Sequence, residues 1–143
     1  MPRYAGKSLV VMVENGSSAE VALTFVTAVT INDAYDENTT MGDTVKAALA
    51  GQRVSEIVVD YEYDTTATTG NQAVLDGIDG DNVNPRFIRV RPIGTASGSP
   101  QFSMDAVLLR FGPVGVSREN TIVAQAIFKN HHAASADPVW ANQ

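Results

Sequence analysis

Residues 53–63 read RVSEIVVDYEY, and apolar or aromatic side chains alternate with acidic ones along this stretch. The odd positions hold Ile57, Val59, Tyr61 and Tyr63. The acidic side chains of the even positions are Glu56, Asp60 and Glu62. Because successive side chains of a strand point to opposite faces, this stretch predicts a β-strand with a partly buried face and an acidic face.

The segments before this strand predict a hairpin. Residues 9–13 form a short apolar run, and Asn15-Gly16-Ser17-Ser18 is a strong turn signal. Residues 21–31 then alternate with period two over their whole length, which predicts one long strand.

The segments after it are also mostly strands. Runs at 86–93, 101–111 and 121–129 have strand composition, and Gly112-Pro113 is expected to end the second of them. Residues 71–78 predict a short helix. The sequence therefore predicts a mainly β protein, a sandwich or barrel-forming sheet with one or two short α-helices. We expect one β domain over residues 1–130 and a polar C-terminal tail over 131–143 with Trp140 as its aromatic anchor.

One segment departs from this pattern. Residues 32–43 have the composition of an acidic loop, and residues 39–53, TTMGDTVKAALAGQR, carry a short helical pattern. Asp43 suits an N-cap, Val45, Ala48 and Leu49 fall on one helix face, and Gly51 suits a C-cap. Two turns of helix are marginal in isolation, so this expected helix needs a neighbour to pack against.

The composition limits the number of domains and the classes of function that the chain can have. The chain has 143 residues, 44% of them hydrophobic, which suits one globular domain. Much of the apolar content is Ala and Val, so we expect a thin core that neighbouring subunits complete. The net charge of −6 argues against tight binding of nucleic acid. The first apolar run is too short for a signal peptide or a membrane span, so we expect a soluble protein made in a cytosol.

A search for catalytic chemistry finds no catalytic, cofactor or metal site. The absence of cysteine excludes disulfides and thiolate chemistry, and no Ser-His-acid order, HExxH or P-loop motif is present. His131-His132 is expected to be a solvated pair, because adjacent side chains are poorly placed to share a metal. Residues 76–84 resemble a calcium loop only superficially, since Val83 occupies the fifth position and no glutamate follows at the twelfth. We therefore expect no enzyme activity.

Two clusters of charged residues are better suited to interaction surfaces than to a catalytic site. Arg86, Arg89 and Arg91 form a local basic cluster, which favours salt bridges across an interface over phosphate contacts. The acidic face of residues 53–63 is either an ordinary solvated face or the lining of a channel.

The order of these segments resembles the major tail tube protein of long-tailed (siphovirus-type) bacteriophages. In that family a Thr-x-x-Gly-Asp stretch, here at 39–43, is often followed by a glycine and a basic residue, here Gly51 and Arg53. A strand then closes on an aromatic-x-aromatic or Gly-x-x-x-Asp type ending, matched here by Tyr61, Tyr63 and Asp64. The segment GPVGVSRENTIVAQAIFKN resembles the last two strands of the same fold, so the resemblance covers residues 5–130.

The resemblance implies a structural virion protein with the tail-tube fold. Such subunits form hexameric rings that stack into a hollow tube, the conduit for genome delivery. It implies partners in the same particle: other copies of the chain, and the tape-measure, tail-terminator and baseplate proteins. DNA would pass without specific binding, and no membrane or cofactor is implied. The expected location is the virion tail, after assembly in the host cytoplasm.

The resemblance also assigns roles to residues. Glu56, Asp60 and Glu62 are candidates for the tube lumen, and Arg86, Arg89 and Arg91 for interface charges. The candidates for an inter-subunit loop are Asp33, Asp36, Glu37, Met41, Asp43, Val45, Ala48 and Leu49.

Two alternatives stay open at this stage. A head–tail joining, tail-completion or capsid-decoration protein of a phage would share a β-sandwich core. A ligand-binding β-sandwich would need exposed aromatic side chains, for which the candidates are Tyr35, Tyr61, Tyr63 and Trp140.

Overall fold

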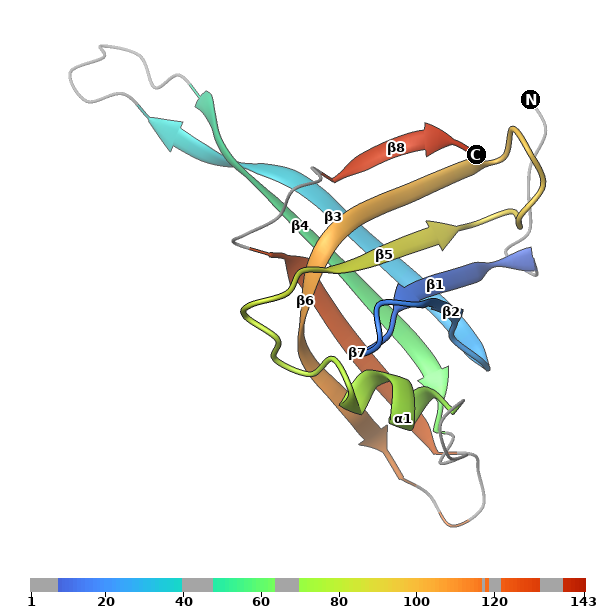
Figure 1. Cartoon of the computed structure of the whole chain (residues 1–143). Coiled ribbons are helices and arrows are strands. Elements are labelled where there is room, and N and C mark those ends of the chain that lie inside the picture. The colour runs from blue at the N-terminus through green and yellow to red at the C-terminus, as the bar shows by residue number, and fades with distance from the viewer. Residues whose placement is uncertain (1–7, 40–47, 64–69, 117, 119–121, 132–137) are drawn as a thin grey trace.

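The computed structural model describes residues 8–39, 48–63, 70–116, 118, 122–131 and 138–143, with only the backbone described for 35–39 and 48–53. The strands are β1 Val10–Glu14, β2 Glu20–Ala22, β3 Val26–Thr39, β4 Ala48–Glu62, β5 Arg86–Arg91, β6 Pro100–Gly115, β7 Val123–Asn130 and β8 Val139–Asn142 (Figure 1). One short helix, α1 Asn71–Asp76, lies between β4 and β5 in the sequence. The prediction of a mainly β protein with one or two short helices is confirmed.

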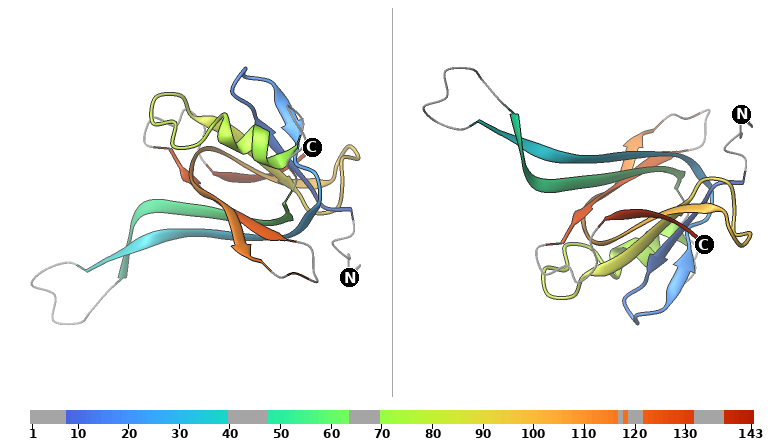
Figure 2. Two further views of the ribbon diagram at one scale, coloured as in Figure 1. Left: turned by 90° about the horizontal axis from the view of Figure 1, so that it is seen from below. Right: turned by 90° about the horizontal axis from the view of Figure 1, so that it is seen from above.

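The strands form one antiparallel sheet that folds over itself at β6. The order is β2-β1-β5-β6-β7-β4-β3, and β8 also pairs with β6. The first part of β6 pairs with β5 and β8, whereas the part from Ala106 onward pairs with β7. A register shift between Leu108 and Arg110 accompanies this change of partner. Figure 2 shows the resulting two layers.

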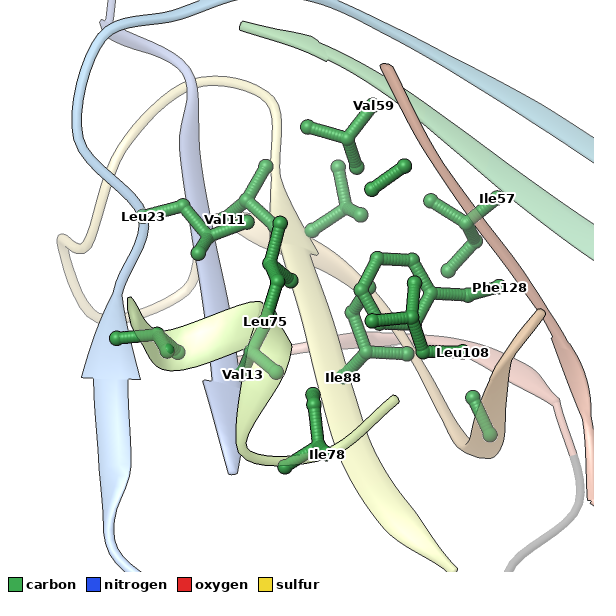
Figure 3. Packing of buried hydrophobic residues seen from close by; sticks show 14 of the residues in the cluster. Val11, Val13, Leu23, Ile57, Val59, Leu75, Ile78, Ile88, Leu108 and Phe128 are labelled. Carbon is green, nitrogen blue, oxygen red and sulfur yellow. The ribbon is translucent and has the colours of Figure 1, made fainter. Parts of the chain in front are cut away.

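The core lies between the layers, as the alternation in the sequence requires. In β4 the odd positions Ile57, Val59 and Tyr61 are fully buried, and the even positions are partly exposed. The other strands of both layers contribute further large buried side chains, among them Phe128, Leu108 and Ile88 (Figure 3). Phe102 of β6 is also fully buried. Each such side chain contributes roughly 1.5–3 kcal/mol of hydrophobic stabilisation. The predicted faces of residues 53–63 are confirmed.

The prediction of one continuous strand over residues 21–31 is wrong. The chain leaves β2 after Ala22, turns through a corner where Phe25 has a φ of 55°, and enters β3 at Val26. Asn71 of α1 fixes this corner: its side-chain oxygen accepts from the Thr24 amide at 2.7 Å, and its side-chain nitrogen donates to the Thr24 carbonyl. Alternation along the sequence could not reveal this turn, because it is stabilised by a helix 47 residues away.

The expected acidic loop and the expected helix are also corrected. Residues 32–39 continue β3, and residues 48–53, including Gly51, continue β4, so Gly51 is not a helix C-cap. Met41, Asp43 and Val45 lie outside the described residues. Antiparallel pairing gives every second residue of each strand a pair of backbone hydrogen bonds across the hairpin, which outweighs the weak propensity of a two-turn helix.

Gly112-Pro113 does not end β6, which runs to Gly115. Gly112 has a φ of 133°, which glycine adopts readily, and Pro113 pairs with Ala124 of β7. Within the described ranges no strand pairs with β6 on its other side here, and proline is tolerated on such an edge.

The C-terminal residues contribute to the same sheet. β8 pairs with residues 100–103 of β6, and the Trp140 ring lies 5.3 Å from that of Phe102. The expectation of a solvated His131 is wrong, since this residue is 3% exposed and its Nε2 lies 3.0 Å from the Asp81 carbonyl oxygen. His132 lies outside the described residues. The polar residues around His131 in the sequence suggested that its side chain is exposed to solvent. Its partner, Asp81, lies in a turn that is distant in the sequence.

Candidate assembly surfaces

The acidic face of β4 lies on the outer side of the layer made by β3, β4, β7 and the second part of β6. Glu56, Asp60 and Glu62 point away from the buried odd positions of the strand and are partly exposed. Their strand neighbours on β7 are, in order, Lys129, Gln125 and Val123. The structure thus brings the three predicted lumen residues onto one face.

This face is more mixed in charge than the sequence of β4 alone indicates. The Lys129 ammonium lies 3.6 Å from a carboxylate oxygen of Glu56, and Gln125 donates to Asp60 at 3.0 Å. Arg110, which pairs with Ile127 of β7, is exposed on β6. The sequence analysis did not assign Gln125, Lys129 or Arg110 to this face. The alternation in residues 123–130 could have identified Gln125 and Lys129, because they alternate with the buried Ala124, Ala126 and Phe128.

The described residues of the predicted inter-subunit loop lie in the outer part of a two-stranded ribbon. β7 pairs with β4 over Glu56–Glu62, whereas residues 48–55 of β4 pair with β3 alone. This ribbon, defined as residues 33–39 and 48–55, extends away from the body in Figure 1. It contains Asp33, Asp36, Glu37, Ala48 and Leu49.

A polar contact marks the point where the ribbon leaves the body. The Ser55 hydroxyl donates to the Asp33 carboxylate at 2.6 Å, and the Ser55 amide donates to the Asn130 side chain at 3.3 Å. Ser55 is fully buried, so its polar groups need these partners. Asp33 therefore has a role inside its own subunit, at the base of the ribbon.

The layer made by β3, β4, β7 and the second part of β6 is called the outer layer below. Among the residues that the structure describes, it has two edges without a strand partner. One is the far side of β3, the last strand in the order. The other is the part of β6 after Leu108, where β5 no longer pairs and a single bridge joins Leu108 to Asp79. Unpaired edges expose backbone donors and acceptors, so a protein normally covers or pairs them.

The three arginines have partners within their own chain. Arg86 is 8% exposed, donates to Asp81 at 2.9 Å and lies 3.6 Å from Glu14. Asp81 also accepts from the amides of its turn, and these bonds together lower the pKa of its carboxyl to about 2. The expectation that the Arg86 charge faces a neighbouring subunit is thus corrected, because the turn before β5 folds back onto it.

Arg89 and Arg91 are partly exposed on the outer face of β5. Arg89 pairs with Glu20 at 3.1 Å and lies over the Phe87 ring, 4.5 Å from its centroid. Arg91 donates to Gln101 at 3.0 Å. An interface role for these two residues stays a prediction.

The described residues offer little to small-molecule chemistry. They contain no group of three His, Cys, Asp or Glu side chains that could hold a metal ion. Tyr61, a candidate for an exposed ligand-binding ring, is fully buried, and burial raises its pKa to about 12. None of the helices in this part of the chain has the length and apolar character needed to cross a membrane.

Solved structures with the same architecture come from tails and injection systems. A chain in the tail of an empty gene transfer agent particle, with C6 symmetry, has a TM-score of 0.63 at 17% identity, covering 94% of this chain and 99% of that one. The fold is tail-tube-like.

Two further tail-tube-like matches are similar in quality. A chain in the six-fold symmetrised baseplate of the anti-feeding prophage has a TM-score of 0.63 at 9% identity, covering 99% of this chain and 96% of that one. A chain in the extended sheath–tube complex of an extracellular contractile injection system has a TM-score of 0.60 at 14% identity, covering 93% and 88%. No protein-family model and no curated protein sequence matches this chain.

Proposed function

We propose that this chain is a structural virion protein that forms hexameric rings stacked into a phage-type tail tube, with no catalytic role. The observation that carries the proposal is the outer layer, which has a charged face directed away from the core and, among the described residues, two edges without a strand partner. Its likeness to chains from a C6-symmetric tail and from a sheath–tube complex supports the same assignment.

The rings would close through the edges of this layer. The edge of β3 in one subunit pairs with the edge of β6 after Leu108 in the next, so that the layers join into one barrel. Because two different edges meet, the contact is heterologous, and a suitable rotation closes it into a ring. Closure would pair both exposed edges at once.

The lumen would be lined by the face that carries Glu56, Asp60 and Glu62. That face is opposite the core, so a barrel whose cores point outward places it inside. Carboxylates repel DNA phosphates and let the genome slide past, while Lys129 and Arg110 limit the net charge. The ribbon would reach a neighbouring subunit, because a two-stranded ribbon alone is marginally stable.

The wider assignments rest on the resemblance in the sequence and on the fold. Tape-measure, tail-terminator and baseplate proteins are the expected partners, the virion tail is the expected location, and the host cytoplasm is the expected place of assembly. The three similar structures come from a gene transfer agent, the anti-feeding prophage and a contractile injection system. They support a tail tube protein and leave the siphovirus type a prediction of the sequence.

Electron microscopy of the purified protein tests the proposal. In negative stain, concentrated protein should show rings or tubes with a central hole. Rings that never stack would favour a head–tail joining or tail-completion protein. A sample that stays monomeric at high concentration would contradict ring assembly altogether.

A charge-reversal variant tests the lumen separately. Replacing Glu56, Asp60 and Glu62 with Lys should leave tubes intact but make them retain DNA, because each Lys adds a phosphate contact. Binding should weaken steeply as salt rises. A control changes Asp76, Asp79 and Asn82, which are exposed and lie outside this face, to Lys. Equal DNA retention by both triple variants would rule out the lumen assignment.

A further inference from the structure

The second part of β6 has one edge without a strand partner among the described residues, and the hydrogen-bond pattern identifies the backbone groups on it. The Tyr63 amide donates to the Ile122 carbonyl at 2.9 Å at the start of the β4–β7 ladder. Hydrogen-bonded pairs alternate along an antiparallel ladder, so the even residues of β7 bond β4 and the odd residues bond β6. The β6 partners of those odd residues include Arg110 and Gly112. The backbone N–H and C=O of Phe111 therefore point toward the unpaired edge.

Two features shorten this edge of β6. The Gly80 amide donates to the Leu108 carbonyl at 2.9 Å, so the turn after α1 occupies its beginning. Pro113 lies two residues after Phe111 and faces the same edge, but proline has no N–H to donate. Between residues 110 and 113, only Phe111 therefore presents both a donor and an acceptor to a second strand.

The unpaired edge of β3 has complementary groups. The Glu62 amide donates to the Phe25 carbonyl at 3.0 Å, so the even residues of β4 bond β3. Their partners over residues 28–32 are also even, and the backbone groups of Val29 and Ile31 therefore point to the edge. Both side chains are partly buried against the core, as is that of Phe111. The two edges thus offer matching backbone groups and matching apolar side chains.

We propose that Pro113 prevents the β6 edges of two copies from pairing with each other and so leaves Phe111 available to the β3 edge of the next subunit. The identity of β3 as the partner rests on the proposed ring, whereas the exclusion of β6 from self-pairing does not. Within the outer layer β3 runs antiparallel to β6, and rotation about a ring axis preserves strand directions. The β3 edge of one subunit therefore meets the β6 edge of the next in the antiparallel sense.

The count of lost hydrogen bonds explains the selectivity. Each Pro113 removes one donor from a strand contact that it joins. A contact between two β6 edges contains two such prolines, whereas a contact between β6 and β3 contains one. Proline on an edge is a common means by which proteins avoid unwanted strand pairing. A β6–β6 pair would be isologous and would use up the β6 edges of both copies, which would stop ring growth.

Pro113→Val tests the inference in a background whose β3 edge is blocked. Ile31→Pro removes a donor from the β3 edge without removing a bond to β4, so this background should be folded and monomeric. Adding Pro113→Val restores the β6 donors and should raise the association constant for dimers by about tenfold or more. Sedimentation velocity measures the dimer, and circular dichroism checks the fold. If Ile31→Pro lowers the yield of folded protein, Ile31→Lys replaces it as the block on the edge.

A single cysteine reports which edges meet, because the chain has none of its own. In a six-fold ring the β6 strands of adjacent subunits are separated by four strand spacings, about 19 Å, whereas two paired β6 strands are about 5 Å apart. A bismaleimide that spans two strand spacings, about 10 Å, should therefore link Arg110→Cys only across a β6–β6 contact. We expect this crosslink with Pro113→Val and none when Pro113 is kept.

Thr30→Val is the control for the added apolar side chain. Thr30 is exposed on the same layer, but its backbone groups bond β4, so this change adds a valine without adding an edge donor. In the Ile31→Pro background it should stay monomeric.

The outcomes separate the two proposals. If Pro113→Val stays monomeric in the Ile31→Pro background, or if Arg110→Cys crosslinks while Pro113 is kept, the inference is overturned. If Ile31→Pro alone still forms rings, the proposed ring contact at the β3 edge is wrong, and the crosslink still decides the role of Pro113.

Discussion

The β3–β4 hairpin is one continuous pair of strands, but its two halves depend on different partners. In the inner half, residues 56–62 of β4 also pair with β7, and Ile57, Val59 and Tyr61 are fully buried. In the outer half, residues 48–55 pair with β3 alone. The inner half therefore stabilises the subunit, and we propose that the outer half serves assembly.

The largest expected effect is on the stability of the subunit, to which the inner half of the hairpin should contribute much more than the outer half. Ile57→Ala should lower the free energy of unfolding by about 2–5 kcal/mol, because it leaves a cavity in a closed core. Leu49→Ala, in the outer half of the same strand, should change it by less than about 0.5 kcal/mol. Urea denaturation of dilute, unassembled protein measures both. Equal losses would show that the outer half also belongs to the core of the subunit.

For assembly, we expect substitutions in the outer half of the hairpin to have the larger effect. Leu49→Asp is expected to leave a folded subunit with wild-type circular dichroism that no longer forms tubes, because a carboxylate replaces an apolar side chain in the ribbon contact. Size-exclusion chromatography and microscopy check this outcome. Tubes formed by Leu49→Asp at the wild-type concentration would remove the ribbon from the interface.

A smaller effect concerns the corner that directs β3 and hence the ribbon. Asn71→Ala removes the bonds to Thr24 and leaves a part-buried amide unsatisfied, which should cost about 1–3 kcal/mol. The exposed Asn82→Ala serves as a control and should stay within about 0.5 kcal/mol of wild type. Thermal melts of both variants measure the difference. A neutral Asn71→Ala would mean that the corner is stabilised by something other than α1.

Acid should weaken the body through Asp81. Hydrogen bonds from its turn and from Arg86 lower the pKa of this carboxyl from 3.8 to about 2 in the folded protein. A lowered pKa adds stability above the unfolded value, and this contribution is lost as pH falls from about 4 through about 2. Asp81→Asn should flatten the pH dependence of stability in that window. An unchanged slope would contradict the lowered pKa of the Asp81 carboxyl.

The smallest effect is expected on the outer face of the inner half. Lys129→Ala breaks the exposed pair with Glu56, and such pairs contribute roughly 0–1 kcal/mol. Stability should hardly change, which would confirm that this face is not needed for folding. A loss above about 2 kcal/mol in a urea titration would indicate that the face is structural.

The sequence predicted the parts of this molecule that depend on local alternation. The faces of residues 53–63, the helix at α1 and the strands β5 and β7 follow from spacing and turn residues alone. The corner at Phe25, the buried His131 and the pairing of β8 depend on contacts with distant residues, which alternation does not encode. The expected helix in 39–53 was wrong at residues 48–53 because strand pairing outweighed local propensity.

The same distinction applies to the candidate surfaces. The acidic face was predicted because it lies on one strand, whereas Lys129 and Gln125 come from β7 and needed the register. Arg86 was assigned to an interface because its cluster is local in sequence. Its real partner, Asp81, is only five residues away, but a turn had to be recognised to place it.

A cryo-electron microscopy reconstruction of the assembled protein tests the central claim most directly. It should show a hollow six-fold tube in which the β3 edge of one subunit pairs with the β6 edge of the next. Glu56, Asp60 and Glu62 should line the lumen, and the ribbon should contact a neighbouring subunit. An assembly without a lumen, or one in which this face points outward, would contradict the account.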